Sequence, residues 1–356
     1  PRRNDWDSGC SSTMRTQLRR FGGVFLILVI SIIIATAVGS VSIPFRRVVG
    51  MVGSKLPGVG SLITPTWTKA QEVIILQIRL PRVLLALLIG GGLSVSGVLF
   101  QGTLRNPLAD PYIIGVSSGA SLGATLGLLF FIPQGLVGIG TLPLFAFVGA
   151  LGTTAIVARL GQQRGQLEST SLILAGVAVG SFLTAIVSLL MVLRIQNLQD
   201  VYLWLLGSLS GRGWKHLLVA LPYVLFGVMA ALWLARDLNV YLLGEETAHS
   251  LGIDVQKLQR RVLVTGSLVA AACVAVSGVI GFVGLMIPHA LRLIVGAEHN
   301  RLIFHSFWVG ALFLLLADTV ARMAFSPLEL PVGIITAFVG GPFFIFLMKR
   351  GSGIHD

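Results

Sequence analysis

Long apolar runs separated by short polar stretches dominate the pattern along this chain. A membrane-spanning helix needs about 20 mostly apolar residues, and runs of that kind lie at 21–39, 83–104, 112–132, 142–158, 170–193, 217–235, 303–321 and 332–348. The run at 262–296 is too long for one helix and is broken by glycines and a proline, so we divide it near 281 into a full helix and a short one. The pattern predicts an all-α polytopic membrane protein with about ten transmembrane helices.

A polar segment with two prolines separates the second and third predicted helices. It reads RNPLADP and runs from Arg105 to Pro111. Because Pro107 and Pro111 cannot continue a helix, the chain must turn here, and Asp110 is placed to cap the helix that follows. We interpret the segment as a structural turn at the inner end of the second helix rather than as a substrate contact.

Two stretches of the chain resemble each other. VSGVLFQGTLRNPLADPYIIG (95–115) and VSGVIGFVGLMIPHALRLIVG (276–296) align without gaps and match at nine of 21 positions. Five predicted helices separate the two copies, so they are expected to run in opposite orientations. Inverted repeats with interrupted helices are typical of transporters, and the pattern predicts an inverted internal repeat.

Composition agrees with a membrane protein and narrows its chemistry. Of the residues, 54% are hydrophobic and 11% are charged, whereas soluble domains are about a quarter charged. The net charge of +12 needs no nucleic acid partner, because basic residues lie mostly between apolar runs, where they anchor and orient helices. Two cysteines and six scattered histidines lack metal-binding spacing. We therefore expect no metal site and no bound cofactor.

Charge at the two ends predicts the orientation. MRTQLRRF, from Met14, reads like a natural start, so residues 1–13 are set aside as a segment that precedes it. Basic residues at Arg15–Arg20 and at Lys349–Arg350 place both termini in the cytoplasm. The outer loop 44–82 is also basic, against the usual bias, and an acidic partner outside the membrane is a candidate cause.

Six stretches together resemble the FecCD-type permeases, the membrane subunits of ABC importers for ferric siderophores, haem and cobalamin. They are NPLADPYIIGVSSGASLGA, LAGVAVGSF, WLLGSLSGRGW, GFVGLMIPHALRLIVG, LLLADTVAR and ELPVGIITAFVGGPFFIFLM, in the family's order from about residue 21 to 350. The resemblance implies a type II ABC importer fold of ten helices, a second permease subunit (a copy or a related chain), two cytoplasmic ABC ATPases and a periplasmic or lipoprotein substrate-binding protein. It implies a bacterial inner-membrane location and three regions: a tail at 1–20, a permease domain at 21–350 and a C-terminal tail at 351–356.

The chain has no GxxxxGK[ST] phosphate-binding loop, so we expect partner subunits to use the ATP and Mg and this chain to be no enzyme. GEETAHSLGIDVQKLQRR (244–261) is the longest charged stretch of the membrane-embedded part and resembles the family's coupling loop. A short helix stopped by a glycine, followed by a charged helix, would form a rigid knob; the alternative is a solvated inner loop. The candidate ATPase contacts are Gly244, Glu245, Glu246, Ala248, Leu251 and Gly252.

The resemblance also assigns a role to three arginines near outer helix ends, Arg79 and Arg82 in IRLPR and Arg322 in ADTVAR. In the cobalamin member the matching arginines accept glutamates of the binding protein, and guanidinium groups suit such pairs because they bind carboxylates in a bidentate way. The alternative is that they are interfacial anchors. Helices five and ten are implied to line the translocation path. Its candidate residues are Thr184, Ser188, Met191, Thr336 and Phe338.

The expected function is ATP-driven import of a metal chelate by alternating access, with ferric siderophore as the first choice and cobalamin or haem as alternatives. An ion-coupled secondary transporter would need a carboxylate deep in the bundle, yet Asp110, Asp318 and Glu329 lie near predicted helix ends. A membrane enzyme is disfavoured because polar residues within the apolar runs are too sparse for an acid–base set.

Overall fold

The computed structural model describes residues 27–39, 43–55, 64–130, 141–163, 166–193 and 198–352. The tail at 1–20 and residues 353–356 lie outside them. The helices are Ile27–Ala37, α2 (Phe45–Gly53), α3 (Lys69–Val73), η2 (Ile74–Arg79), α4 (Leu80–Thr103), η3 (Pro111–Ile114), α5 (Val116–Phe130), α6 (Thr141–Leu160), α7 (Ser169–Leu193), α8 (Leu198–Leu205), α9 (Trp214–Tyr241), α10 (Glu245–Ser250), α11 (Val255–Ser277), α12 (Val283–Val295), α13 (His299–Met323) and α14 (Val332–Ser352). A small antiparallel pair joins β1 (Gln162–Gln163) to β2 (Gln166–Leu167).

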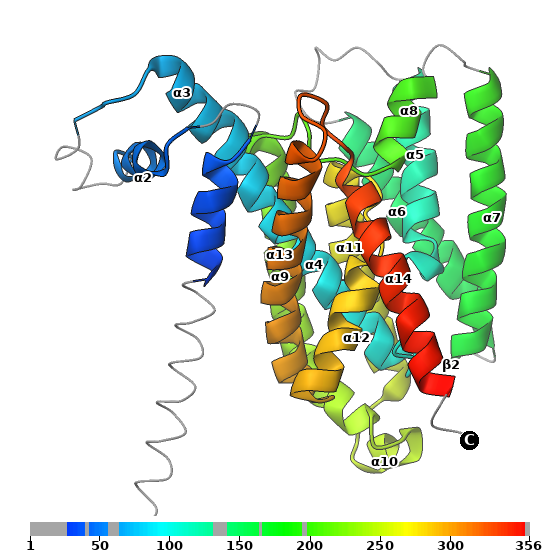
Figure 1. The fold of residues 1–356 in the computed structure, drawn as a ribbon. Helices are drawn as coiled ribbons and strands as arrows, with labels where there is room; N and C mark the ends of the chain where they lie inside the picture. The colour runs from blue at the N-terminus through cyan, green and yellow to red at the C-terminus, as the bar shows by residue number, and fades with distance from the viewer. Residues whose placement is uncertain are drawn as a thin grey trace, which may run out of the picture.

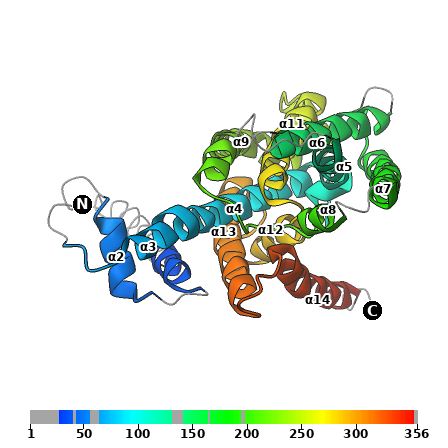
Figure 2. The same ribbon diagram turned by 90° about the horizontal axis from the view of Figure 1, so that it is seen from above.

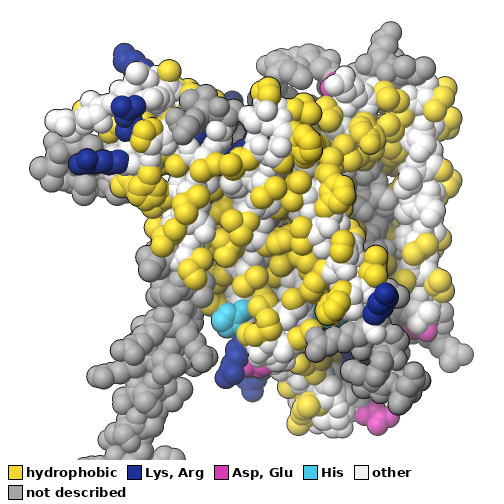
Figure 3. Space-filling view, viewed as in Figure 1, with side chains coloured by type: hydrophobic (Ala, Val, Ile, Leu, Met, Phe, Trp, Pro, Cys, Tyr) yellow, Lys and Arg dark blue, Asp and Glu magenta, His cyan; other side chains and the backbone are white. Residues whose placement is uncertain are grey.

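Each of the ten predicted apolar segments corresponds to a helix of the described chain, which confirms the all-α polytopic fold. Among the described residues, six helices are long and apolar enough to cross a membrane, and four shorter apolar helices accompany them. The break predicted near 281 is present: α11 ends before Gly278 and α12 begins after Phe282, both of which have positive φ. Hydrophobic side chains cover the middle of the visible face, and charged side chains gather towards its two ends (Figure 3).

The spanning helices stand side by side, with α4 inside the bundle and α7 at its edge (Figures 1 and 2). In the most apolar stretch of the helix that contains α4, 89% of the residues are buried. In the corresponding stretch of α7, 17% of the residues are buried. Glycines allow α4 this close packing, because a Cβ on Gly90 would meet the carbonyl oxygen of Gly310 in α13 and one on Gly97 that of Gly284 in α12. The exposed α7 is therefore the element with most surface left for lipid or a partner.

The proline-containing turn has the predicted structure. The side chain of Asp110 accepts a hydrogen bond from the backbone N–H of Tyr112 at 2.8 Å and so caps η3. The hydroxyl of Tyr112 donates to the carbonyl oxygen of Ile280 at 2.9 Å. The turn after α4 is thus tied to the break between α11 and α12, two interruptions that are far apart in the sequence.

The gapless alignment of the two similar stretches does not correspond to matching structure. Gly97 lies within α4, whereas its counterpart Gly278 ends α11; Pro107 follows α4, whereas Pro288 lies inside α12. What the two regions share is a long helix, a break and a shorter helix. The two long helices α4 and α11 run in opposite directions (Figure 1), which agrees with inverted copies but not with that residue-by-residue register.

Candidate functional sites

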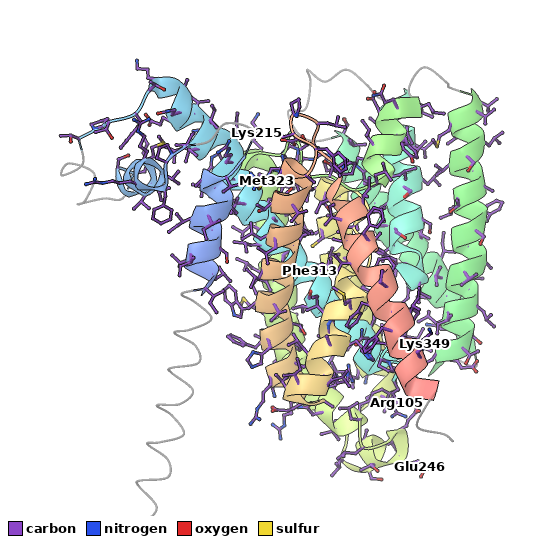
Figure 4. All side chains as sticks on the ribbon, viewed as in Figure 1. Arg105, Lys215, Glu246, Phe313, Met323 and Lys349 are labelled. Carbon is purple, nitrogen blue, oxygen red and sulfur yellow. The ribbon has the colours of Figure 1, made fainter. Side chains whose placement is uncertain are left out.

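A short helical projection, α10, stands at one end of the bundle. Gly244, with φ 120°, ends the turn after α9, and Gly252, with φ 83°, ends the turn after α10. Such positive φ values favour glycine. Asp254 then caps α11 by accepting a hydrogen bond from the backbone N–H of Lys257 at 3.0 Å. Figure 4 places Glu246 on this projection, at the same end as Arg105 and Lys349 and opposite Lys215 and Met323.

The projection has one buried anchor and an open outer surface. Ala248 is fully buried, and its carbonyl oxygen accepts a hydrogen bond from the N–H of Ile253 at 3.0 Å. Leu251 exposes 63% of its surface. An open hollow of about 630 Å³ beside them is lined by Glu245, Glu246, His249, Gly252 and residues 253–256. A fixed projection with an exposed leucine beside acidic groups can fit a socket on another protein.

The three arginines singled out from the sequence lie together at the opposite end, in η2, α4 and α13, and all three are buried. Arg82 donates to Asp318 through Nε and Nη2, the latter at 2.9 Å to Oδ1. Arg322 Nε lies 3.2 Å from Asp318 Oδ2. Two guanidinium groups therefore meet on one carboxylate that has no exposed surface.

The same cluster holds the end of the first helix. Arg79 Nη1 donates to the carbonyl oxygens of Thr36 and Ala37, at 3.2 and 3.0 Å, and Arg322 Nη2 donates to that of Ala35 at 3.0 Å. The last carbonyls of a helix have no partner within the helix, and cations there also complement its dipole. These arginines thus join the first helix to η2 and α13.

Glu329 is the more accessible carboxylate of the cluster. Its Oε2 lies 2.7 Å from Arg82 Nη1, and its side chain is 37% exposed. Burial alone would raise the pKa of Glu329, but the hydrogen bond and charge of Arg82 lower it below its ordinary value. Glu329 is therefore ionised at neutral pH, in the segment that leads from α13 into α14.

The guanidinium groups of these three arginines already have partners inside the chain. Whether they also receive a carboxylate of a binding protein stays a prediction. Sequence reasoning noted Asp318 and Glu329 only as residues near helix ends and missed them as partners. The available signal was the spacing of Asp318 and Arg322, four residues apart on one helix face.

The five candidate path residues fall into different environments. α7 forms one wall of an open groove of about 610 Å³, with η3 and α5 opposite, and a row of hydroxyl groups but no charged side chain lines its described surface. The hydroxyl-bearing residues of this lining are Tyr112, Ser117, Ser118, Ser181, Thr184 and Ser188. Thr184 and Ser188 are thus placed on an open surface, and Met191 is partly buried further along α7.

The other two candidates lie on α14. Phe338 is exposed beside a second groove of about 480 Å³, lined mainly by apolar residues of α8, α14 and the segment after α11. Thr336 is fully buried, and its hydroxyl donates to the carbonyl oxygen of Gly333 at 3.1 Å. Thr336 therefore does not line an open surface of this structure, because its side chain faces the interior of the chain.

No group of three or more His, Cys, Asp or Glu side chains that could hold a metal ion occurs among the described residues.

The model of the FecCD transport family matches residues 27–350. The chain belongs to the FecCD transport family. Members of this family are membrane components of ABC importers, so this chain is a multi-pass membrane permease subunit.

Relatives within the FecCD family agree over most of the chain. It is 39% identical to the hemin transport system permease protein HmuU of Yersinia pestis, over 94% of this chain and 97% of that one. It is 45% identical to the cobalamin import system permease protein BtuC of Halobacterium salinarum, over 78% of this chain and 74% of that one. These two relatives carry different cargoes, so identity at this level does not select a cargo.

A solved structure described as an inward-facing conformation of a metal-chelate type ABC transporter is also similar. Its TM-score is 0.78 at 34% identity, and the match covers 93% of this chain and 99% of that one. This match confirms the type II permease fold expected from the sequence over most of the chain.

Proposed function

We propose that this chain is the permease subunit of an ATP-driven importer that moves a metal chelate, ferric siderophore as the first choice, into the cytoplasm by alternating access. Family membership supports the importer class. The observation that carries the proposal is the α10 projection, a rigid surface of 244–252 at one end of the bundle with Leu251 exposed. Two partner ATPases would engage this surface and use the ATP and Mg, and no cofactor is assigned to this chain.

The orientation follows from the same assignment. If α10 meets the ATPases, its end of the bundle is cytoplasmic, and the end of α14 lies there as well (Figure 1). The opposite end, with the arginine cluster and Lys215, then faces the substrate-binding protein. Arg79, Arg82 and Arg322 are proposed to contribute to docking by exchange, in which an incoming carboxylate takes the place of Glu329 on Arg82.

The path is proposed to form between this chain and a second permease, a copy or a related chain. Support comes from α7, which is mostly exposed, and from the uncharged hydroxyl groove that carries Thr184 and Ser188. A bulky chelate with many hydrogen-bond acceptors can slide along such a surface, because no charged side chain there holds it tightly. Met191 and Phe338 extend the proposed path along α7 and α14.

The position and pairing of the buried carboxylate do not favour the alternative of an ion-coupled secondary transporter. Asp318 is fully buried, but its charge is shared by two arginines at one end of the bundle, so it is not placed to bind an ion midway through the membrane. Haem and cobalamin remain the alternative cargoes within the family.

A panel of chelates separates these cargoes. The cognate binding protein is titrated with ferric siderophores, haem and cobalamin, and uptake of each bound chelate is measured with the assembled transporter. The proposal expects one ferric siderophore to bind and to be taken up. Uptake of haem or cobalamin alone would mean that the cargo is not a siderophore, while the importer function would stand. If no chelate is taken up although the ATPases are active, the proposal that the substrate is a metal chelate is rejected.

A further inference from the structure

The part of the chain around α2 and α3 leaves the bundle sideways. This segment, called the lateral arm, comprises residues 43–55 and 64–73. It lies at the end opposite α10 (Figure 1) and extends away from the side that carries α7 and α14 (Figure 2). It therefore stands beside the bundle rather than over it, where the surrounding bilayer surface would be.

The direction of α2 matches that position. Figure 1 presents α2 end-on while the spanning helices stand upright, and Figure 2 presents it lengthwise, so its axis lies across the spanning direction. Amphipathic helices that bind a bilayer surface lie in this way, with the apolar side towards the acyl chains.

One face of α2 packs against the rest of the protein, and a neighbouring face is exposed. Val48 and Met51 are buried and pack in a small apolar cluster with Ile75 of η2. Phe45 and Val49 lie one turn apart on the adjoining face and expose 54% and 44% of their surfaces. The packed face fixes the helix on the protein and leaves this apolar pair open.

Positive charge surrounds the exposed pair. The described residues of the lateral arm carry four basic residues, Arg46, Arg47, Lys55 and Lys69, against the single acidic residue Glu72. Glu72 already pairs with Lys55 at 2.8 Å. Arg46 is exposed next to the pair, and arginine can keep its charge at a phosphate while its stem covers apolar surface.

We propose that the lateral arm is a membrane-surface anchor in which α2 binds anionic phospholipid headgroups. Phe45 and Val49 enter the acyl-chain boundary, and Arg46 and Arg47 contact the phosphates. Juxtamembrane basic residues are attracted to anionic lipid surfaces. This role is separate from transport, and it accounts for a basic outer segment without requiring a protein partner over that segment.

Spin labels can locate α2 in the assembled transporter. Cys10→Ser removes one native cysteine, and Cys273 is buried. A nitroxide is placed at Val49→Cys and, as a matched exposed control, at Lys55→Cys, with the transporter in lipid nanodiscs. In discs containing phosphatidylglycerol, the label at 49 should be more accessible to oxygen and less accessible to a water-soluble nickel chelate than the label at 55. Equal accessibility to the nickel chelate at both positions would overturn the proposal.

The charge requirement is tested with the same label. The protection at position 49 should be greater in phosphatidylglycerol than in phosphatidylcholine discs, and Arg46→Gln with Arg47→Gln should abolish that difference. Arg46→Lys with Arg47→Lys keeps the charge and should retain it. A difference that persists in the glutamine variant, or is lost in the lysine variant, contradicts recognition by charge. Protection in phosphatidylcholine discs that appears only with the loaded binding protein would assign the surface to that protein instead.

Discussion

Asp318 is the carboxylate on which Arg82 and Arg322 converge, and it has no exposed surface. A buried ion pair contributes little net stability, because desolvation offsets attraction. Removing one partner, however, costs about 3–5 kcal/mol, since the other charge is left buried without a counter-ion. The first role of Arg82 and Arg322 is therefore structural, because they pair with the buried Asp318 whether or not they also contact a partner protein.

Asp318→Asn is therefore expected to lower the thermal unfolding midpoint of the purified permease strongly. It removes the charge while keeping the shape, so the two guanidinium groups lose their shared partner. Glu298→Gln is the matched control, because Glu298 pairs with Arg301 on the surface at 2.8 Å and such pairs are worth little. Equal midpoints for the two variants would contradict the structural role of the cluster.

Glu329→Gln tests the exposed member of the same cluster. The pKa of Glu329 lies below its ordinary 4.5, because Arg82 outweighs the effect of burial. The stability it adds is then complete above that ordinary value and is lost as the pH falls through the lowered pKa. The variant should be less stable than the parent at neutral pH, and the difference should shrink in acid below about pH 4.5.

The same variant also examines docking by exchange. With Glu329 neutral, Arg82 is more available to an incoming carboxylate, so affinity for the loaded binding protein should rise at low salt and the gain should fade as salt increases. An unchanged affinity would leave the arginines with their structural role alone.

Helices could be predicted from the sequence where the run of apolar residues was long enough to stand out. The ten helices that match the predicted segments are evident from the sequence because long apolar runs stand out. α2 and α8 were missed because they have nine and eight residues, too few for such a run, and the helix that contains α4 begins at Lys69 rather than at 83. α9 runs from Trp214 to Tyr241 rather than 217–235, since polar residues at both ends continue the helix.

The site was predictable only in part, for a different reason. The short helix α10 could be inferred because Gly252 marks its end locally. The burial of Arg82 could not, because its partner Asp318 is 236 residues away in the sequence. Long-range pairing of this kind leaves no local pattern.

The coupling element gives its own prediction. Leu251→Asp should leave the permease folded but weaken its binding to the ATPases, because an exposed leucine loses its fit to an apolar socket. Leu328→Asp is the matched control, since Leu328 is 66% exposed in the segment between α13 and α14 at the opposite end. Gly252 is a poorer choice, because its φ of 83° strains any larger residue.

The measurement is copurification of the ATPases with each variant, together with the basal ATP hydrolysis of the purified complex. Loss of both with Leu251→Asp and retention of both with Leu328→Asp is the expected result. Equal ATPase binding and hydrolysis for the two variants would mean that α10 is only a solvated inner loop.

At the scale of the whole molecule, orientation depends on which end meets the cytoplasm. With Cys10→Ser, a membrane-impermeant maleimide in intact cells should label Lys215→Cys and should label Lys257→Cys only after the membrane is opened. These lysines stand at opposite ends of the bundle, one at the start of α9 and one in the first turn of α11. The reverse labelling would invert the assignment of α10 to the cytoplasm.

This chain is proposed to move a chelate with energy from ATP that other subunits hydrolyse. The most direct test is uptake of a ferric siderophore into proteoliposomes that contain this chain and its ATPases, with the loaded binding protein on the opposite side from ATP. The account predicts uptake that requires ATP and Mg, stops when the ATPases are left out, and persists after ionophores collapse proton and sodium gradients. Uptake that proceeds without ATPases and ends when those gradients are collapsed would contradict it.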